Sequence, residues 1–226
     1  KEGLVAIGLP VAPFEAIAAA SDLAAARERI PGEGVLKTSS FGYDGKGQAR
    51  IQSGAELAAA WRGLGEVPCV LEELVPFEEE ISVIVARGVT GDVAIYEPFA
   101  NEHTNHILDV TTCPAGLEPS VALEVERIAR AVVEGLDVVG VLCVELFRLG
   151  DGTILVNEVA PRPHNSGHLT IDAHTCSQFE QQVRAVAGLP LGSSERVGPP
   201  AAMSNLLGDL WANGAPDFAA ALAIPE

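Results

Sequence analysis

A long apolar run, Val138 to Val159, constrains the fold most strongly, because an Asp151-Gly152 pair interrupts it. Asp-Gly favours a two-residue type I′ turn, so the run predicts a β-hairpin. The first strand of this hairpin carries one isolated acid, Glu145, and the return strand carries a second, Glu158. A buried strand carries an unpaired charge only at a large desolvation cost. The two acids therefore indicate a site.

The expected turn also fixes which residues face each other. If Asp151 and Gly152 form the whole loop, Glu145 lies directly opposite Glu158 on the same face of the sheet. Like charges in that arrangement destabilise a sheet. A hard cation between them would turn the penalty into a binding site, and Mg²⁺ prefers such oxygen ligands together with phosphate. A turn shifted by one residue, with Glu145 in a solvent channel, is the alternative.

An arginine and two histidines follow the hairpin. Arg162 offers a planar guanidinium fork that suits carboxylate or phosphate oxygens. His164 and His168 are four residues apart, which would suit a metal on a helix. Pro161 and Pro163 argue against a helix at the start of this segment, so loop or substrate-contact histidines are the favoured interpretation.

Gly42 to Gln48 form a second candidate, a glycine-rich loop that contains no GxxxxGK[ST] match. Its glycines would let backbone N–H groups approach phosphates, with Lys46 in the loop and Lys37 on the preceding strand supplying charge. An ordinary turn with a solvated lysine is an equal alternative. Acids at a further strand end, in Glu72 to Val75 and at Glu80, would contact adenine and ribose, or would form a solvated acidic loop.

Composition excludes several classes of partner. Acidic residues outnumber basic ones by 31 to 14, for a net charge of −17, so a nucleic acid polymer is not an expected partner, whereas a nucleotide is not excluded. No run of 18 apolar residues is present, and no membrane partner is expected. The four cysteines form no CxxC pair, which favours reduced thiols and a cytoplasmic location.

Helical and strand patterns are mixed without regular alternation, which favours an α+β fold with antiparallel sheets. The sequence predicts helices over residues 14–30, 53–64, 119–135 and 177–187. It predicts strands over residues 34–38, 49–52, 70–74, 80–87, 92–99 and 201–207, besides the hairpin.

Together these segments resemble the ATP-grasp superfamily and, more narrowly, the 5-(carboxyamino)imidazole ribonucleotide synthase family. The two most specific strings are Gly-Tyr-Asp-Gly-Lys-Gly-Gln at residues 42–48 and Pro-His-Asn-Ser-Gly-His at residues 163–168. The other segments that carry the resemblance are residues 35–38, 80–83, 105–108, 157–162, 177–180 and 205–209. Other ATP-grasp ligases share the two-acid hairpin without these two strings.

The resemblance implies an ATP-grasp small subdomain at residues 1–75, a large subdomain at 76–190 and, at 191–226, a linker and the start of a C-terminal β domain. ATP would bind between the two subdomains. The nucleotide-contact residues implied are Lys37, Gly42, Tyr43, Asp44, Gly45, Lys46, Gly47, Gln48, Glu72, Glu73, Leu74, Val75, Glu80, His103, Asn157 and Glu158. Glu145 and Glu158 would hold Mg²⁺.

The resemblance also implies the reaction. ATP would phosphorylate bicarbonate to carboxyphosphate, with release of ADP. Carboxyphosphate, or CO₂ released from it, would then carboxylate the amine of 5-aminoimidazole ribonucleotide in purine biosynthesis, with release of phosphate. Tyr43, Asp44, Arg162, His164 and Asn165 would contact the acceptor or bicarbonate, with Lys46, Arg162 and His164 as catalytic residues. The family resemblance further implies a homodimer.

The chain starts at Lys1, and its one methionine is Met203, which indicates a fragment. Against the family pattern, we expect that the N-terminal nucleotide-fold domain and most of the C-terminal β domain are absent from this chain. We therefore expect weak or no activity from the chain alone. Two alternatives stay open: another ATP-grasp ligase, of the biotin carboxylase or formate-dependent transformylase type, and a non-catalytic nucleotide-binding module.

Overall fold

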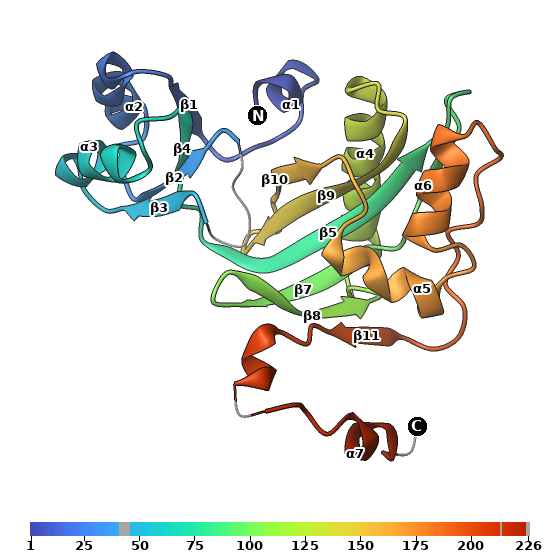
Figure 1. The fold of residues 1–226 in the computed structure, drawn as a ribbon. Helices are drawn as coiled ribbons and strands as arrows, with labels where there is room; N and C mark the ends of the chain where they lie inside the picture. Colours follow the sequence, from blue (N-terminus) through green and yellow to red (C-terminus); the bar gives the residue numbers. More distant parts are fainter. Residues whose placement is uncertain (41–45, 213, 225–226) are drawn as a thin grey trace.

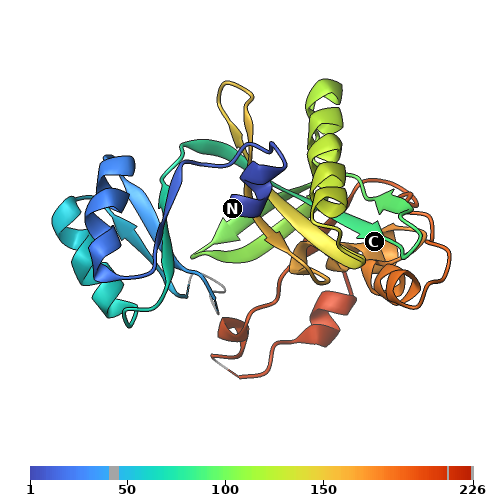
Figure 2. The same ribbon diagram turned by 90° about the horizontal axis from the view of Figure 1, so that it is seen from above.

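Two antiparallel sheets, each with its own helices, make up the fold. The structure is a computed structural model that describes residues 1–40, 46–212 and 214–224. Figure 1 shows the smaller sheet with α2 and α3 on one side of the molecule and the larger sheet with α4, α5 and α6 on the other. Seen from above in Figure 2, the two units lie side by side, and the chain passes from one to the other through β5.

The smaller sheet has the strand order β1-β4-β2-β3 in the described part of the chain. Its elements are β1 (Phe14–Ile17), α2 (Leu23–Arg29), β2 (Gly34–Thr38), β3 (Gln48–Ile51), α3 (Gly54–Gly63) and β4 (Cys69–Glu73). Leu36 and Leu71 point into the core shared with the two helices, together with Trp61 of α3. Because side chains alternate along a strand, Lys37 and Glu72 point to the opposite face.

The larger sheet has the order β10-β9-β5-β7-β8-β11, with β6 beside β5. Its strands are β5 (Phe77–Arg87), β6 (Val93–Ile95), β7 (Phe99–Thr104), β8 (Ile107–Cys113), β9 (Gly140–Leu149), β10 (Ile154–Ala160) and β11 (Ala201–Ser204). Helix α4 (Pro119–Gly135) covers one face with an apolar stripe, in which Val125, Ile128 and Val132 are fully buried. Fully burying such side chains stabilises the fold by about 1.5–3 kcal/mol each.

The other face of the larger sheet is covered by the 3-10 turn η2 (Asn165–Leu169), α5 (Thr170–Ala173) and α6 (Gln178–Val186). Ser177 caps α6, because its hydroxyl accepts a hydrogen bond from the N–H of Glu180. Beyond β11 the chain continues through η3 (Gly208–Trp211) to α7 (Phe218–Leu222), which lies apart from both sheets in Figure 1.

The expected helix over residues 14–30 is wrong in its first half. Residues 14–17 form β1, paired antiparallel with β4, and the helix begins only at Leu23. Asp22 satisfies the turn between them, because its Oδ2 accepts 2.9 Å hydrogen bonds from the N–H groups of Ala18 and Ala19. Strand pairing thus overrides a local helix preference. The expected strand over 92–99 is divided into β6 and β7, and β8 was not expected.

The apolar side chains of the first residues pack on the larger unit. Leu4, in α1 (Glu2–Ala6), and Leu9 lie in the core cluster beneath α4. The division of the chain into subdomains at residues 75 and 190 stays a prediction. The structure adds that Leu4 and Leu9 pack on the larger unit and that β11 belongs to the larger sheet. In the described residues, no helix is both long enough and apolar enough to cross a membrane.

His174 gives the fold a dependence on pH. Its ring is buried against Tyr96 and Phe99, and its Nδ1 has no hydrogen-bond partner among the described residues. Burial lowers the pKa of His174. As the pH falls, His174 is therefore protonated first in the unfolded chain, from about pH 6.5 downward. The free energy of unfolding decreases over this range, until the pH falls below the lower pKa that His174 has in the folded state.

We expect the difference in unfolding free energy between wild type and His174→Phe to be constant above about pH 7. Below that pH the difference should change in favour of the variant. Urea unfolding at a series of pH values measures it, and a difference that is constant down to about pH 5 would contradict the prediction.

Candidate active site

The two acids of the hairpin meet as predicted, although the turn differs. The loop has three residues, Gly150 to Gly152, closed by hydrogen bonds of Leu149 with Thr153 and Gly152, and Gly152 has a φ of +86°. The register therefore starts one residue away from the expected one. A β-bulge between Val156 and Glu158 restores it, and Glu158 faces Glu145. The pairing is confirmed, whereas the two-residue turn is wrong.

The bulge also decides which face the return strand presents. Ile154 and Val156 lie in the core beneath α4, as does Val159. The extra residue, Asn157, shifts the alternation, so Glu158 and Ala160 point to the other face, where Glu145 and Cys143 lie. A regular strand would have sent Glu158 into the apolar core.

The acid pair carries negative charge that the protein only partly neutralises. The two carboxyl groups face each other across the paired strands, and each affects the pKa of the other. Burial raises the pKa of Glu145, but contact with His164, whose Nε2 lies 3.0 Å from Glu145 Oε1, outweighs it and lowers the pKa overall. Partial burial and the charge of Glu145 raise the pKa of Glu158, which lies at the more exposed rim. The carboxylate oxygens and the negative charge of this pair suit a hard divalent cation.

A thiol lies beside these groups. Ligand atoms of Cys143, Glu145 and His164 all lie within 4.8 Å of one another. Burial raises the pKa of Cys143 well above its ordinary value, and sulfur is a soft ligand, whereas Mg²⁺ prefers carboxylate oxygens. Glu158 is therefore the better partner of Glu145 for a hard cation.

Lys37 connects the two sheets at this site. Its Nζ lies 3.2 Å from Glu72 Oε2 on β4 and 3.2 Å from Asn157 Oδ1 at the bulge of β10. Glu72 is buried, and its Oε2 also lies 3.2 Å from Lys1 Nζ. Burial lowers the pKa of Lys1, although Glu72 opposes this. Two lysines thus converge on one carboxylate next to the acid pair.

Glu80 and His103, predicted to contact the nucleotide, form an ion pair between β5 and β7. The hydrogen bond to Glu80 raises the pKa of His103. Glu73 is exposed at the end of β4, and Leu74 and Val75 lie in the half-buried connection to β5. The nucleotide roles of all five residues stay predictions.

The remaining predicted residues fall into two groups, those outside the described part of the chain and those at exposed or half-buried positions. Gly42, Tyr43, Asp44 and Gly45 lie outside the described residues. Next to them, Lys46 is exposed, Gly47 accepts the N–H of Thr38, and Gln48 pairs with Lys37. After the hairpin, Arg162 is exposed and its Nη1 donates to the Pro163 carbonyl at 3.0 Å, while Asn165 is half-buried at the start of η2.

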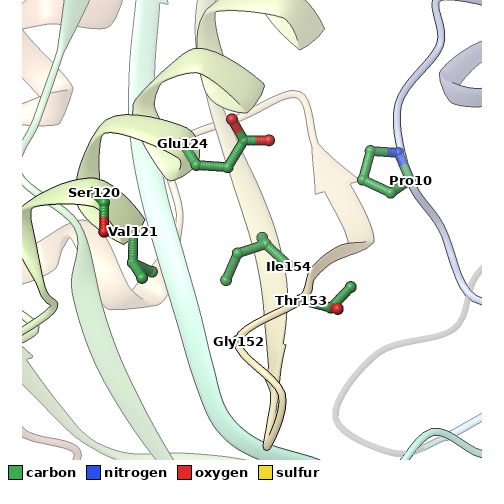
Figure 3. Close-up of a pocket in the computed structure, with 7 residues that line it drawn as sticks. All are labelled: Pro10, Ser120, Val121, Glu124, Gly152, Thr153 and Ile154. Atoms are coloured by element: carbon green, nitrogen blue, oxygen red, sulfur yellow. The ribbon is translucent and has the colours of Figure 1, made fainter.

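A shallow hollow lies on the other side of the hairpin (Figure 3). It is lined by Pro10, Ser120, Val121, Glu124, Gly152, Thr153 and Ile154. Ile154 belongs to the face covered by α4, so this hollow does not open onto the acid pair. Glu124, its charged side chain, already pairs with Arg127.

Sequence reasoning missed the polar residues beneath the acids. Ser82 of β5 faces Glu145, is fully buried, and donates to Ser166 of η2. The sequence did contain a signal for this residue, because Ser82 is a small hydroxyl residue in an apolar strand, on the face opposite Ile81 and Val83. Its importance depends on the pairing of β5 with β9, which local patterns do not give.

Comparison with known proteins agrees with this geometry. A model of the ATP-grasp domain matches residues 2–179. The chain is 44% identical over 211 residues to the N5-carboxyaminoimidazole ribonucleotide synthase of Brucella melitensis, covering 92% of this chain and 58% of that protein. The chain thus spans somewhat more than half of that relative.

Solved structures give the same result. A synthetase of the same name from Thermus thermophilus aligns with a TM-score of 0.86 at 39% identity, covering 99% of this chain and 59% of that one. A synthase from Aspergillus clavatus, described as a complex with ADP and 5-aminoimidazole ribonucleotide, aligns with a TM-score of 0.85 at 29% identity, covering 99% and 60%. The α+β class is confirmed, and the chain belongs to the ATP-grasp family.

Proposed function

We propose that the chain forms the nucleotide-binding and carboxylating core of an N5-carboxyaminoimidazole ribonucleotide synthase. The observation that carries the proposal is the directly opposed pair Glu145 and Glu158, which lies beside Lys37 where the two sheets meet. Its support from outside the chain is the name shared by similar proteins and the ADP and aminoimidazole ribonucleotide in one of their structures.

Glu145 and Glu158 would hold Mg²⁺, because both offer carboxylate oxygens and together carry incompletely neutralised charge. A bound Mg²⁺ neutralises charge on the ATP phosphates as the phosphoryl group transfers. Lys37 would bind the same phosphates through its Nζ, and Asn157 and Glu72 would keep that ammonium at the junction of the sheets.

The adenine and ribose of the nucleotide would lie along the residues that extend from the end of β4 to β7. Residues 72–75 would contact adenine, and Glu80 with His103 would contact the ribose. The glycine-rich loop, residues 42–48, would cover the phosphates and exclude water, which protects a phosphorylated intermediate from hydrolysis. Lys46, at the end of that loop, would add positive charge.

Carboxylation would proceed in two steps on the side of the acids that bears Arg162, His164 and Asn165. An oxygen of bicarbonate attacks the γ-phosphorus of ATP, giving carboxyphosphate and releasing ADP. The exocyclic amine of 5-aminoimidazole ribonucleotide then takes the carboxyl group, loses a proton and releases phosphate. Arg162 would bind the anionic oxygens through its guanidinium fork. We further propose a cytoplasmic location and a homodimeric full-length enzyme.

The test measures ADP release with Mg-ATP, alone and with bicarbonate and aminoimidazole ribonucleotide. We expect release that needs both substrates, at a low rate for this chain. Release that needs biotin or formate with its own acceptor would favour another ATP-grasp ligase. Calorimetric binding of Mg-ATP without ADP release under any of these conditions would favour a nucleotide-binding module without catalytic function.

A further inference from the structure

A chain of hydrogen bonds runs beneath the acid pair and ends on His164. It links three strands of the larger sheet to η2. Its steps are Thr111 Oγ1 to Asn101 Oδ1 (3.0 Å), Asn101 Nδ2 to Ser82 Oγ (2.8 Å), Ser82 Oγ to Ser166 Oγ (2.8 Å) and Ser166 Oγ to His164 Nδ1 (2.9 Å). On its other side, His164 Nε2 lies 3.0 Å from Glu145 Oε1.

The direction of this chain follows from donor and acceptor chemistry. The amide nitrogen of Asn101 only donates, so the oxygen of Ser82 accepts there and its own hydrogen goes to Ser166. The hydrogen of Ser166 is then left for Nδ1 of His164. A reversed chain would leave the hydroxyl hydrogen of Ser82, which is fully buried, without an acceptor among the described residues.

Burial makes this order costly to disturb. Ser82, Thr111 and Ser166 have no exposed surface, so no solvent replaces a lost partner. The backbone N–H of Ser166 also points at Nδ1 of His164, at 3.4 Å. Both neighbours present hydrogens to Nδ1, so Nδ1 accepts, and in a neutral imidazole the hydrogen then resides on Nε2.

We propose that Ser82 and Ser166 are positioning residues that hold His164 in the tautomer with hydrogen on Nε2. His164 then serves the site as a fixed hydrogen-bond donor, to Glu145 or to an anionic oxygen beside it, and not as a general base. This use in carboxylation depends on the proposed function, whereas the tautomer itself does not.

The experiment reads the tautomer directly, by nitrogen NMR of the protein labelled with ¹⁵N-histidine, free of metal and nucleotide. A pH of about 8 keeps ordinary histidines neutral. We expect wild-type His164 to show an unprotonated Nδ1 and a protonated Nε2. Protonated Nδ1 in the wild type would overturn the proposal without any variant.

Glu145 also favours hydrogen on Nε2, so its contribution is removed first. In Glu145→Ala we expect His164 to keep the Nε2–H form, because the chain from Ser82 and Ser166 is intact. Adding Ser166→Ala should give a mixture of both tautomers, and adding Ser82→Ala a smaller change. Adding Ser194→Ala, which removes a hydroxyl bonded to the Ile95 carbonyl elsewhere, should change nothing.

Two results would contradict the proposal in this series. A mixture already present in Glu145→Ala would assign the tautomer to Glu145 alone. An unchanged Nε2–H form in Glu145→Ala with Ser166→Ala would remove the serine from any such role. Neither result depends on ATP turnover, so failure here is distinguishable from failure of the proposed function.

Discussion

Replacing Glu158 by glutamine is expected to weaken Mg-ATP binding by about 100-fold or more, while the metal-free protein becomes more stable to heat. The first effect follows because the variant removes a direct ligand, whereas losing even an outer partner of a ligand costs about 10–100-fold. The second follows because burial, and after it the charge of Glu145, raise the pKa of Glu158; the fold thus disfavours its negative charge, which an amide removes. A site built for binding thus carries a cost in stability.

Glu79→Gln is the matched control, since it removes one negative charge from β5 where Glu79 pairs with Arg148 at 3.0 Å. Calorimetry with Mg-ATP and thermal unfolding without metal measure the two effects in both variants. Equal nucleotide affinity in Glu158→Gln and Glu79→Gln would contradict the role of Glu158. A lower thermal stability of metal-free Glu158→Gln, with no such loss in Glu79→Gln, would also contradict the account.

Lys37→Met is expected to weaken ATP binding by about tenfold to a hundredfold, which corresponds to the loss of a charged hydrogen bond of about 1.5–3 kcal/mol. Its aliphatic side chain keeps the volume of the lysine stem but loses the ammonium shared by Glu72 and Asn157. Because the proposed contact is to phosphate, binding of adenosine should not change. The variant should also be less stable, since buried Glu72 then keeps, within the described part of the chain, Lys1 alone as a charged partner.

Arg50→Met provides the control, because Arg50 lies on β3, beside β2, and pairs with the exposed Glu33. It removes the same charge from the same sheet without touching the junction. Calorimetric titrations with ATP and with adenosine decide the case. An equal loss of affinity for both ligands in Lys37→Met would assign the effect to a disturbed fold and not to a phosphate contact.

The hairpin shows how far the sequence could predict the site. Glu145 opposite Glu158 was predicted correctly, although the assumed two-residue turn and the assumed regular strand were both wrong. The three-residue loop shifts the register by one residue, and the bulge at Asn157 shifts it back. The spacing of Ile154, Val156 and Val159 contains the signal of the bulge, since the last gap is one residue longer than the strand period.

Elements with strong local patterns, such as α4 and the hairpin strands, followed from the sequence, and so did the α+β class. Contacts between distant strands did not. The bond from Lys37 to Asn157 spans two sheets, and the chain from Ser82 to His164 requires the pairing of β5 with β9. Residues 14–17 became a strand through β4, against their own helix preference. Register between remote segments is set by tertiary packing, which periodicity does not contain.

A crystal structure with Mn²⁺ and ADP, read by anomalous scattering at the manganese edge, tests the role of the acid pair most directly. We predict one manganese peak between the carboxylates of Glu145 and Glu158, at about 2.1 Å from an oxygen of each, as for the Mg²⁺ it replaces. ADP bound with its manganese elsewhere, including on Cys143 and His164 without Glu158, would contradict that role.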